Sequence, residues 1–263
     1  RELQKHLREA LSRNELHLVY QPQIDYQTQQ VVGVEALLRW QHPEHGLVAP
    51  ELFIPLAEQN ESIIPIGKWV LEQACHQLRE WYDQGFSGLR MAVNISTVQL
   101  RHAELPRLVA NLLQMYRLPA GSLELEVTET GLMEDVSTSL QNLKSLRGCG
   151  ALIAIDDFGT GYSSLSYLNS LPLDKIKIDK SFVRQLTEHD DDATIVRAII
   201  QLAKNLKLQV IAEGVETAEQ EAYIVNEGCD EGQGYFYSKP LPPRELALFI
   251  KKARRLAGPP RFA

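Results

Sequence analysis

The chain has 263 residues, close to the roughly 250 of a (β/α)8 barrel and too many for a small disulfide-stapled domain. Hydrophobic residues make up 44% and charged residues 23%, ordinary values for a globular protein that exclude a disordered or coiled-coil chain. The net charge of −7 argues against long DNA or RNA as a partner, because binding to the phosphate backbone needs an excess of cations.

Targeting signals and disulfide frameworks are both excluded. No stretch approaches the ~18 consecutive apolar residues that suggest a membrane-spanning helix, and residues 1–10 are too charged for a signal peptide. The three cysteines, Cys75, Cys149 and Cys229, are far apart and form no CxxC motif. We therefore expect a reducing, cytoplasmic location.

Short β-type runs alternate along the chain with longer segments of helical period. The runs that predict strands are Leu16–Ile24, Val31–Arg39, Leu89–Val93, Leu123–Val127, Ala151–Ile155, Lys175–Ile178 and Leu208–Ala212. The segments that predict helices are Ile66–Trp81, Leu105–Tyr116, Ser137–Leu146, Asp192–Leu206, Ala218–Asn226 and Pro243–Leu256. Residues 1–13 and 258–263 resemble linkers.

This alternation predicts an α/β protein with a mostly parallel sheet, either a closed barrel or an open doubly wound sheet. No GxGxxG follows the first strand and no Walker loop occurs, so we favour a modified TIM (β/α)8 barrel. The first two strands are separated only by residues 25–30, which leaves no room for a helix. They should therefore pair antiparallel.

Polar residues recur at the ends of the predicted strands, where barrel enzymes carry their chemistry. They are Glu35, Asn94, Glu126, Asp156, Asp157, Lys177 and Glu213. Each alone is as well explained by a helix cap or a loop acid. Together they predict a hard-metal site, since clustered carboxylates without cations would repel one another.

The ligand types favour Mg²⁺ or Mn²⁺, which bind carboxylate and amide oxygens. No histidine lies at an HExxH spacing or ends a predicted strand, and we interpret His42 and His45 as a loop pair. Adjacent acids such as Asp156 and Asp157 can serve two ions about 4 Å apart. The glycine-containing segment 158–164 that follows is either a mobile loop or a plain turn with a serine cap.

Seven segments carry motifs in a fixed order. They are Glu35-Ala36-Leu37-Leu38-Arg39-Trp40, Val93-Asn94-Ile95-Ser96, Glu126-Val127-Thr128-Glu129, Asp156 to Leu165, Lys175 to Asp179, Ala212-Glu213-Gly214-Val215-Glu216 and Gln233-Gly234-Tyr235. Together they resemble the EAL family of cyclic di-GMP phosphodiesterases over residues 15–248. The triplet Glu35-Ala36-Leu37 alone would not identify the family, whereas seven matching segments in the same order do.

The resemblance implies a barrel with one antiparallel strand and a role for each matching residue. The implied metal ligands are Glu35, Asn94, Glu126, Asp156 and Asp157, with Asp179 close by. The implied catalytic residues are Lys177, Glu213 as the base and Gln233, which orients the water. The implied ligand contacts are Gln21, Leu38 and Arg39. The implied supporting residues are Glu129, which anchors the loop after Asp157, and Glu216.

The implied reaction is hydrolysis of cyclic di-GMP to linear pGpG by in-line water attack at a site that binds two Mg²⁺ or Mn²⁺ ions. The alternative is a catalytically silent cyclic di-GMP receptor or protein-interaction module. A metal-dependent barrel acting on another phosphorylated metabolite is a third reading. The chain keeps every position that we can match, which favours catalysis.

The resemblance also sets expectations for the whole protein. We expect residues 1–14 to be a lead-in, residues 15–257 to form the phosphodiesterase barrel and residues 258–263 to be a tail. The absence of an initiator Met suggests an upstream sensory or GGDEF-type segment, which could tether the full protein to the inner membrane. The family likeness also implies a homodimer.

Overall fold

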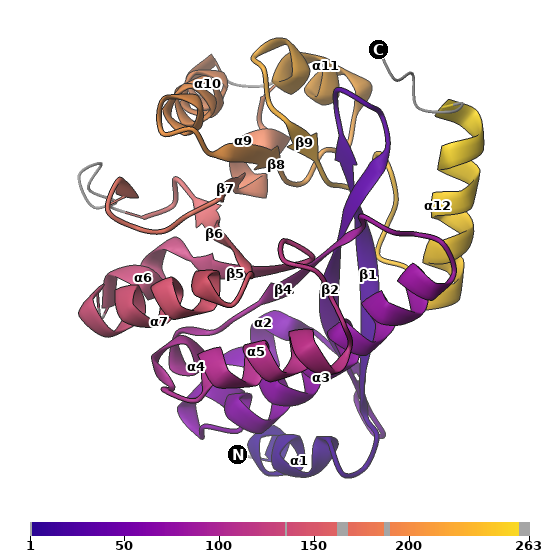
Figure 1. The fold of residues 1–263 in the computed structure, drawn as a ribbon, viewed down its shortest axis with the longest axis vertical. Coiled ribbons are helices and arrows are strands. Elements are labelled where there is room, and N and C mark those ends of the chain that lie inside the picture. Colours follow the sequence, from indigo (N-terminus) through magenta and orange to yellow (C-terminus); the bar gives the residue numbers. More distant parts are fainter. Residues whose placement is uncertain (1, 135, 162–167, 187–189, 258–263) are drawn as a thin grey trace.

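The computed structural model describes residues 2–134, 136–161, 168–186 and 190–257. Its strands are β1 (Leu16–Asp25), β2 (Val31–His42), β3 (Gly46–Val48), β4 (Arg90–Asn94), β5 (Leu123–Thr128), β6 (Leu152–Phe158), β7 (Lys175–Ile178), β8 (Gln209–Ala212) and β9 (Glu231–Gly232). They form one sheet in the order β1-β9-β8-β7-β6-β5-β4-β2-β3, and β1 also pairs with β2. That pairing closes a ring of eight strands and leaves β3 outside it, so the predicted barrel is confirmed (Figure 1).

Strand β1 runs antiparallel to both of its neighbours in the ring, β2 and β9. The antiparallel pairing with β2 was expected from the short link between the two strands. In that link Asp25 Oδ2 accepts hydrogen bonds from the backbone N–H and the hydroxyl of Thr28, at 2.7 and 2.6 Å. The turn fixes the register of the hairpin, which places Gln21 opposite Glu35. The other strand pairs of the ring are parallel.

Helices surround this ring (Figure 1). They are α1 (Glu2–Ala10), α2 (Pro50–Gln59), α3 (Ile63–Asp83), α4 (Thr97–Arg101), α5 (Leu105–Met115), α6 (Glu129–Glu134), α7 (Val136–Gly148), α9 (Lys180–Arg184), α10 (Asp190–Asn205), α11 (Ala218–Asn226) and α12 (Pro243–Ala257). The long helices match the predicted ones. In α3 the buried residues recur every three or four positions, from Ile63 to Trp81, so one face packs on the core.

The barrel interior is polar, and the alternation of strand residues explains why. On β7 the lysines Lys175 and Lys177 alternate with isoleucines, and on β5 the acids Glu124 and Glu126 alternate with leucines. All four charged side chains are at most 1% exposed. Since side chains along a barrel strand point alternately in and out, the charged set fills the interior and the apolar set packs against the helices.

Three local expectations differ from the structure. The first residues are not a linker but the amphipathic helix α1, which contacts α2 and buries Leu7 and Ala10. His42 is not a loop residue, because it ends β2, is 1% exposed and hydrogen bonds to His6 of α1 at 2.6 Å. The eighth strand of the ring, β9, is too short and too polar to be recognised as an apolar run.

Two further observations concern membrane-spanning helices and the cysteines. Among the described residues no helix is long and apolar enough to cross a membrane. The three cysteines carry free thiols, with Cys75 and Cys229 buried. Burial raises the pKa of both buried thiols to about 12, so both remain protonated at neutral pH.

Candidate active site at the carboxyl ends of the strands

Most of the predicted site residues come together at one end of the barrel. Parallel strands deliver their carboxyl ends to the same rim, so residues far apart in sequence become neighbours. The contributors are Glu35 on β2, Asn94 on β4, Glu126 on β5, Asp156 and Asp157 on β6, Lys177 on β7, Glu213 after β8 and Gln233 after β9.

Lys177 is the centre of this cluster. Its Nζ lies 2.5 Å from Glu126 Oε2, 2.8 Å from Glu213 Oε1, 3.4 Å from Asp156 Oδ1 and 3.7 Å from Glu35 Oε2. Burial lowers the lysine's pKa, but the neighbouring carboxylates outweigh burial and hold that pKa well above its ordinary value. Lys177 therefore remains a cation and is shared by four acids.

One lysine does not balance these acids. Burial, and after it the charge of Glu35, raises the pKa of Glu126 well above its ordinary value. Burial and then Asp156 raise the pKa of Glu213 to about 8, and burial with Asp156 and Asp179 raises that of Asp157 to about 6. Without a further cation the cluster must therefore hold protons at neutral pH.

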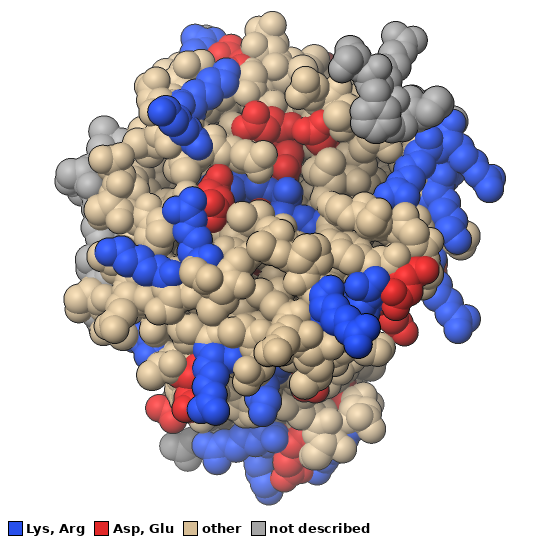
Figure 2. Space-filling view, viewed as in Figure 1, with Lys and Arg blue, Asp and Glu red and all other residues tan. Residues whose placement is uncertain are grey.

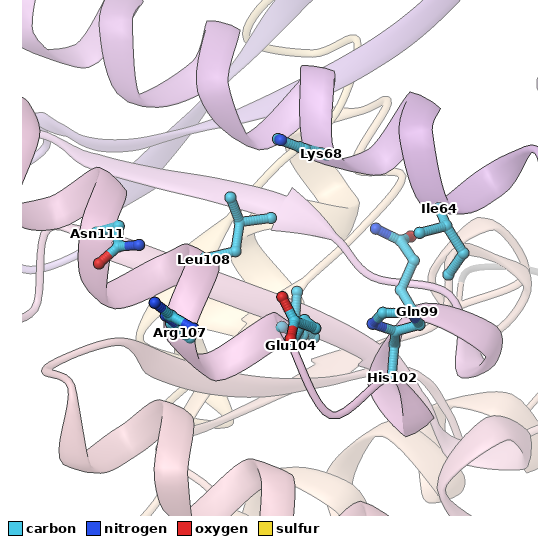
Figure 3. A pocket seen from close by; sticks show the side chains of 9 residues that line it. Ile64, Lys68, Gln99, His102, Glu104, Arg107, Leu108 and Asn111 are labelled. Atoms are coloured by element: carbon cyan, nitrogen blue, oxygen red, sulfur yellow. The ribbon is translucent and has the colours of Figure 1, made fainter.

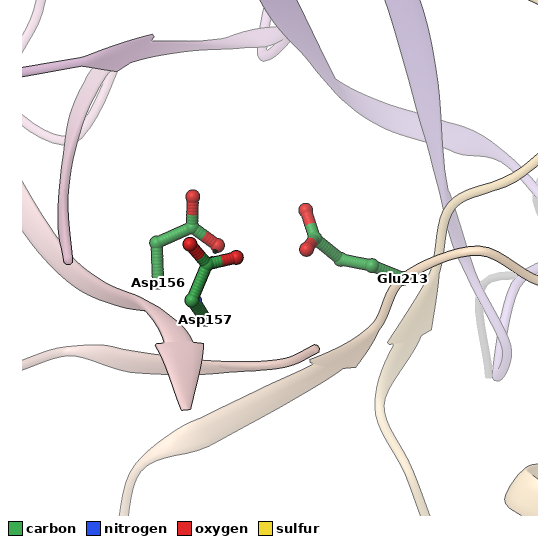
Figure 4. Close-up of side chains that lie close together, drawn as sticks. All are labelled: Asp156, Asp157 and Glu213. Atoms are coloured by element: carbon green, nitrogen blue, oxygen red, sulfur yellow. Dashed lines mark hydrogen bonds between the residues drawn. The ribbon is translucent and has the colours of Figure 1, made fainter. Parts of the chain in front are cut away.

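Three of the acids could share an ion. Asp156, Asp157 and Glu213 each offer a carboxylate oxygen, and these oxygens lie within 4.8 Å of one another. The side chains point toward one another from opposite sides of the opening (Figure 4). Asp157 has a positive φ of 52°, a conformation uncommon outside glycine that lets two successive residues direct their carboxylates at this point.

The donor set fits a divalent metal. Glu126 Oε1 is buried and has no hydrogen-bond partner among the described residues, which leaves a carboxylate oxygen available to a cation. Carboxylate oxygens with one amide are the ligands that Mg²⁺ and Mn²⁺ prefer. The charge deficit, the unpaired oxygen and the ligand type therefore agree on a hard divalent ion.

Glu35 is held as an anion by two amide donors. Asn94 Nδ2 donates to its Oε1 at 2.7 Å, and Gln233 Nε2 donates to its Oε2 at 2.6 Å. Burial raises the pKa of Glu35, but Lys177 and these two amides outweigh burial and lower it overall. The same Gln233 amide donates to Gln21 Oε1 at 3.1 Å, which connects Gln21, an expected ligand contact, to the cluster.

The profile of the family described as "EAL domain" matches residues 4–240 of this chain. The chain is an EAL domain. A relative from Pseudomonas aeruginosa, the bifunctional diguanylate cyclase/cyclic di-GMP phosphodiesterase MucR, is 46% identical to it over 244 residues, which are 93% of this chain and 36% of that protein. The cyclic di-GMP phosphodiesterase NbdA of the same organism is 43% identical over 259 residues, 98% of this chain and 33% of that protein. The EAL domain thus spans about a third of the length of these relatives.

Solved structures of related domains have the same fold. The structure of the PaMucR phosphodiesterase in complex with c-di-GMP superposes with a TM-score of 0.90 at 46% identity, covering 94% of this chain and 100% of that chain. The FimX EAL domain from Pseudomonas aeruginosa, bound to c-di-GMP, superposes with a TM-score of 0.83 at 25% identity, covering 92% of this chain and 97% of that chain.

A cavity of about 280 Å³ adjoins the acidic cluster of this EAL domain. Its lining includes Leu38 and Arg39, the predicted ligand contacts, together with Asn94 and Glu126. The Arg39 guanidinium donates to the carbonyl of Leu38 at 2.9 Å, which folds the side chain back along its own strand. The cavity therefore links the expected ligand contacts to the acids.

A second cavity, about 480 Å³, lies on the flank of the barrel between α3 and α5 (Figure 3). Lys68, His102 and Arg107 are among the residues that line it, and none of the predicted site residues does. On the face seen in Figure 2, acidic and basic side chains lie next to each other in a central hollow, and a group of basic side chains lies at the right edge, where Figure 1 shows α12.

The three predicted supporting residues have different environments. Glu129 Oε2 accepts hydrogen bonds from the backbone N–H groups of Gly159 and Gly161, at 2.9 and 3.3 Å, so it holds the start of the segment after Asp157. Asp179 caps α9 and raises the pKa of Asp157. Residues 162–165 of the expected loop lie outside the described residues.

Glu216 does not reach the cluster through any contact that we observe. It is an exposed residue after β8 and pairs with Arg184 of α9 at 3.1 Å, with 43% of its side chain exposed. The sequence segment that contains both Glu213 and Glu216 gives no indication of which acid points inward. The structure assigns the inward position to Glu213.

Sequence reasoning missed a second buried charged layer. Below the site lie Arg90, Glu124, Lys175 and Glu231, which pair with one another, and Gln23, which connects them to Gln233. The alternations Glu-Leu-Glu on β5 and Lys-Ile-Lys on β7 carried the signal for half of this layer.

Proposed function

We propose that this EAL domain hydrolyses one phosphodiester bond of cyclic di-GMP and releases linear pGpG, in a reaction that depends on Mg²⁺ or Mn²⁺. The observation that carries the proposal is the convergence of Asp156, Asp157 and Glu213 beside the buried cation of Lys177. Its support is the 46% identity to MucR and to the c-di-GMP complex of PaMucR.

The metal ligands proposed are Glu35, Asn94, Glu126, Asp156 and Asp157. Bound divalent ions supply Lewis acidity toward the phosphate and neutralise the repulsion between an anionic substrate and these acids. Glu213 lies close enough to both aspartates to be a ligand as well, and its position also suits a base. We assign it the role of base, because a carboxylate with a raised pKa takes up a proton more readily than an ordinary one, and bound metal would keep it ionised before the reaction.

The chain's own residues have distinct tasks in the proposed reaction. Glu213 accepts a proton from the attacking water as the water oxygen bonds to phosphorus. The bond between phosphorus and the 3′ oxygen of one guanosine breaks, and that oxygen takes a proton from solvent. Lys177 stays charged and stabilises the negative charge that develops near it. Gln233 orients the water and holds Glu35. Gln21, Leu38 and Arg39 contact the dinucleotide.

We also propose the surroundings in which this chemistry takes place. Residues 15–257 form the phosphodiesterase barrel, which acts as a homodimer within a longer protein that carries a sensory or GGDEF-type segment. The length of the curated relatives supports a longer protein, since they are about three times as long. The hold of Glu129 on Gly159 and Gly161 supports a coupling between a regulatory surface and the acids.

The test is incubation of the purified chain with cyclic di-GMP and Mn²⁺ or Mg²⁺, with an EDTA control, followed by chromatography for pGpG. Metal-dependent pGpG is the expected result. Cyclic di-GMP binding without product, in the full-length protein as well, would support the receptor alternative and overturn the assignment of catalysis.

A further inference from the structure

The layer below the site contains two cations and two carboxylates that no step of the proposed reaction uses. Arg90 contacts Glu124 and Glu231 at 3.0 and 2.7 Å, and Lys175 contacts the same two acids at 3.0 and 2.8 Å. These side chains are at most 12% exposed. The layer is therefore a closed, charge-neutral set in the floor of the barrel.

Gln23 of β1 joins this floor to the site. It is completely buried, and its Nε2 donates to Gln233 Oε1 at 3.1 Å while its Oε1 lies 3.4 Å from Arg90 Nη2. Gln233 in turn donates to Glu35 Oε2 at 2.6 Å. A continuous chain of hydrogen bonds thus runs from Arg90 through two amides to a proposed metal ligand.

The donor-to-acceptor direction of these hydrogen bonds is fixed by the charged groups at both ends, Arg90 and Glu35. A guanidinium has only donors, so the oxygen of Gln23 must face Arg90 and its NH₂ group must face Gln233. An ionised carboxylate has only acceptors, so the NH₂ group of Gln233 must face Glu35 and its oxygen must face Gln23. Both amide orientations therefore follow from the charged ends, and Gln21 Oε1, which also accepts from Gln233 Nε2 at 3.1 Å, favours the same orientation of Gln233.

The facing strand leaves room for this arrangement. Gly33 of β2 lies opposite Gln23, and a Cβ added at Gly33 would lie 2.5 Å from Gln23 Oε1 and 3.2 Å from Arg90 Nη2. Its φ is not in the left-handed region, so its backbone would accept alanine. The glycine is needed here for space, and that space is filled by the contact between Gln23 and Arg90.

We propose that Gln23 is a positioning residue, which holds the amide of Gln233 in the orientation that donates to Glu35. The inference rests on the proposed function, since it assigns Gln23 a role in the same site. Losing Gln23 leaves Gln233 Oε1 without its donor, so the Gln233 side chain can shift and its hydrogen bond to Glu35 weakens. Residues that orient metal ligands in this way typically account for about 10- to 100-fold in metal affinity or activity.

The first test compares Gln23→Met with the unmodified chain and with Gln41→Met, a matched control on an exposed position of β2. We expect Gln23→Met to lower kcat and Mn²⁺ affinity about tenfold, with little change in KM for cyclic di-GMP. Mn²⁺ affinity is measured by calorimetry without substrate. Unchanged kcat and Mn²⁺ affinity in a folded Gln23→Met variant would overturn the proposal.

A double-mutant cycle separates positioning from general loosening of the barrel. If Gln23 acts through Gln233, adding Gln23→Met to a Gln233→Met chain has no further effect on Mn²⁺ affinity. Multiplied effects of the two substitutions would show that Gln23 acts by another route. Should Gln23→Met fail to fold, two other variants test the same chain of hydrogen bonds. Gly33→Ala crowds the contact between Gln23 and Arg90, and Gln23→Glu removes the donor to Gln233.

The side-chain amide of Gln233 gives a readout that needs neither turnover nor metal. In the unmodified chain its two NH₂ protons should give separate NMR signals, protected from exchange, and Gln23→Met should shift them and increase their exchange. Failure of the parent chain to release pGpG would count against the proposed function alone. Unshifted and equally protected Gln233 signals in Gln23→Met would count against the positioning role.

Discussion

Lys177 Nζ lies 2.5 Å from Glu126 Oε2, and neither side chain is accessible to solvent. The two residues come from β7 and β5, which do not pair with each other because β6 runs between them. The contact therefore crosses the barrel interior. Since Asp156 and Glu213 also lie within 3.4 Å of the same Nζ, this lysine is the common counterion of the acids in the absence of metal.

Replacing this counterion should cost both stability and activity. In Lys177→Met the length of the side chain is kept but the acids lose their cation, so we expect the free energy of unfolding to fall by roughly 3 kcal/mol. Turnover should fall at least about 100-fold, as expected for loss of a group that stabilises developing charge. Denaturant unfolding and pGpG release measure the two effects. Lys180→Met, an exposed lysine on α9, is the control and should change neither.

The sequence predicted the charged residues at the carboxyl ends of the strands but not the second charged layer below them, and the reason is physical. Residues such as Asp156 and Glu213 end apolar runs, so their position at a rim follows from the strand itself. Glu124 and Lys175 lie inside such runs, where burial depends on partners from other strands. Glu231 lies in a strand of only two residues and has no apolar pattern around it. Which of two nearby acids turns inward, as with Glu213 and Glu216, depends on backbone direction after β8, which the pattern does not fix.

Glu213 and Glu216 form a matched pair for testing the base. Glu213→Gln keeps the shape of the side chain and removes its ability to take a proton, so turnover should fall about 10²- to 10⁴-fold while cyclic di-GMP binding persists. Glu216→Gln breaks an exposed ion pair with Arg184, which is worth at most about 1 kcal/mol, so its turnover should stay within about twofold. Equal losses in the two variants would refute the assignment of the base to Glu213.

Stability of the metal-free chain should depend on pH in a defined direction. The pKa of Glu213 is raised by burial to about 8, so between pH 4.5 and 8 the folded state holds a proton that the unfolded state has released. Asp157, raised to about 6, acts in the same direction at lower pH. Their contribution to the free energy of unfolding therefore decreases as pH rises through this window. Melting curves from pH 5 to 8.5 in EDTA should lose part of this slope in Glu213→Gln.

Metal binding should release protons near neutral pH. Carboxylates must be ionised to bind a cation, and burial raises the pKa of Glu213 to about 8 and that of Glu126 well above its ordinary value. Mn²⁺ titrations at pH 7 in buffers of different ionisation enthalpy should report about one proton or more released per domain. Mn²⁺ affinity should accordingly weaken as pH falls below 7. Binding heats that are independent of the buffer would contradict the raised pKa values.

Glu129 should control order in the segment that follows Asp157. Its carboxylate accepts two backbone N–H groups, those of Gly159 and Gly161, and each charge-assisted bond is worth about 1.5–3 kcal/mol. In Glu129→Ala both bonds are lost, so limited proteolysis between residues 157 and 161 should accelerate and turnover should fall about tenfold or more. Glu129→Gln keeps one acceptor without the charge and should lie between the two chains. Glu104→Ala, at an exposed position before α5, is the control.

Because Glu129 holds the backbone directly after the aspartates, cleavage and turnover should change together across this series. Turnover that falls while cleavage stays constant would mean that Glu129 acts on the acids by a route other than backbone order.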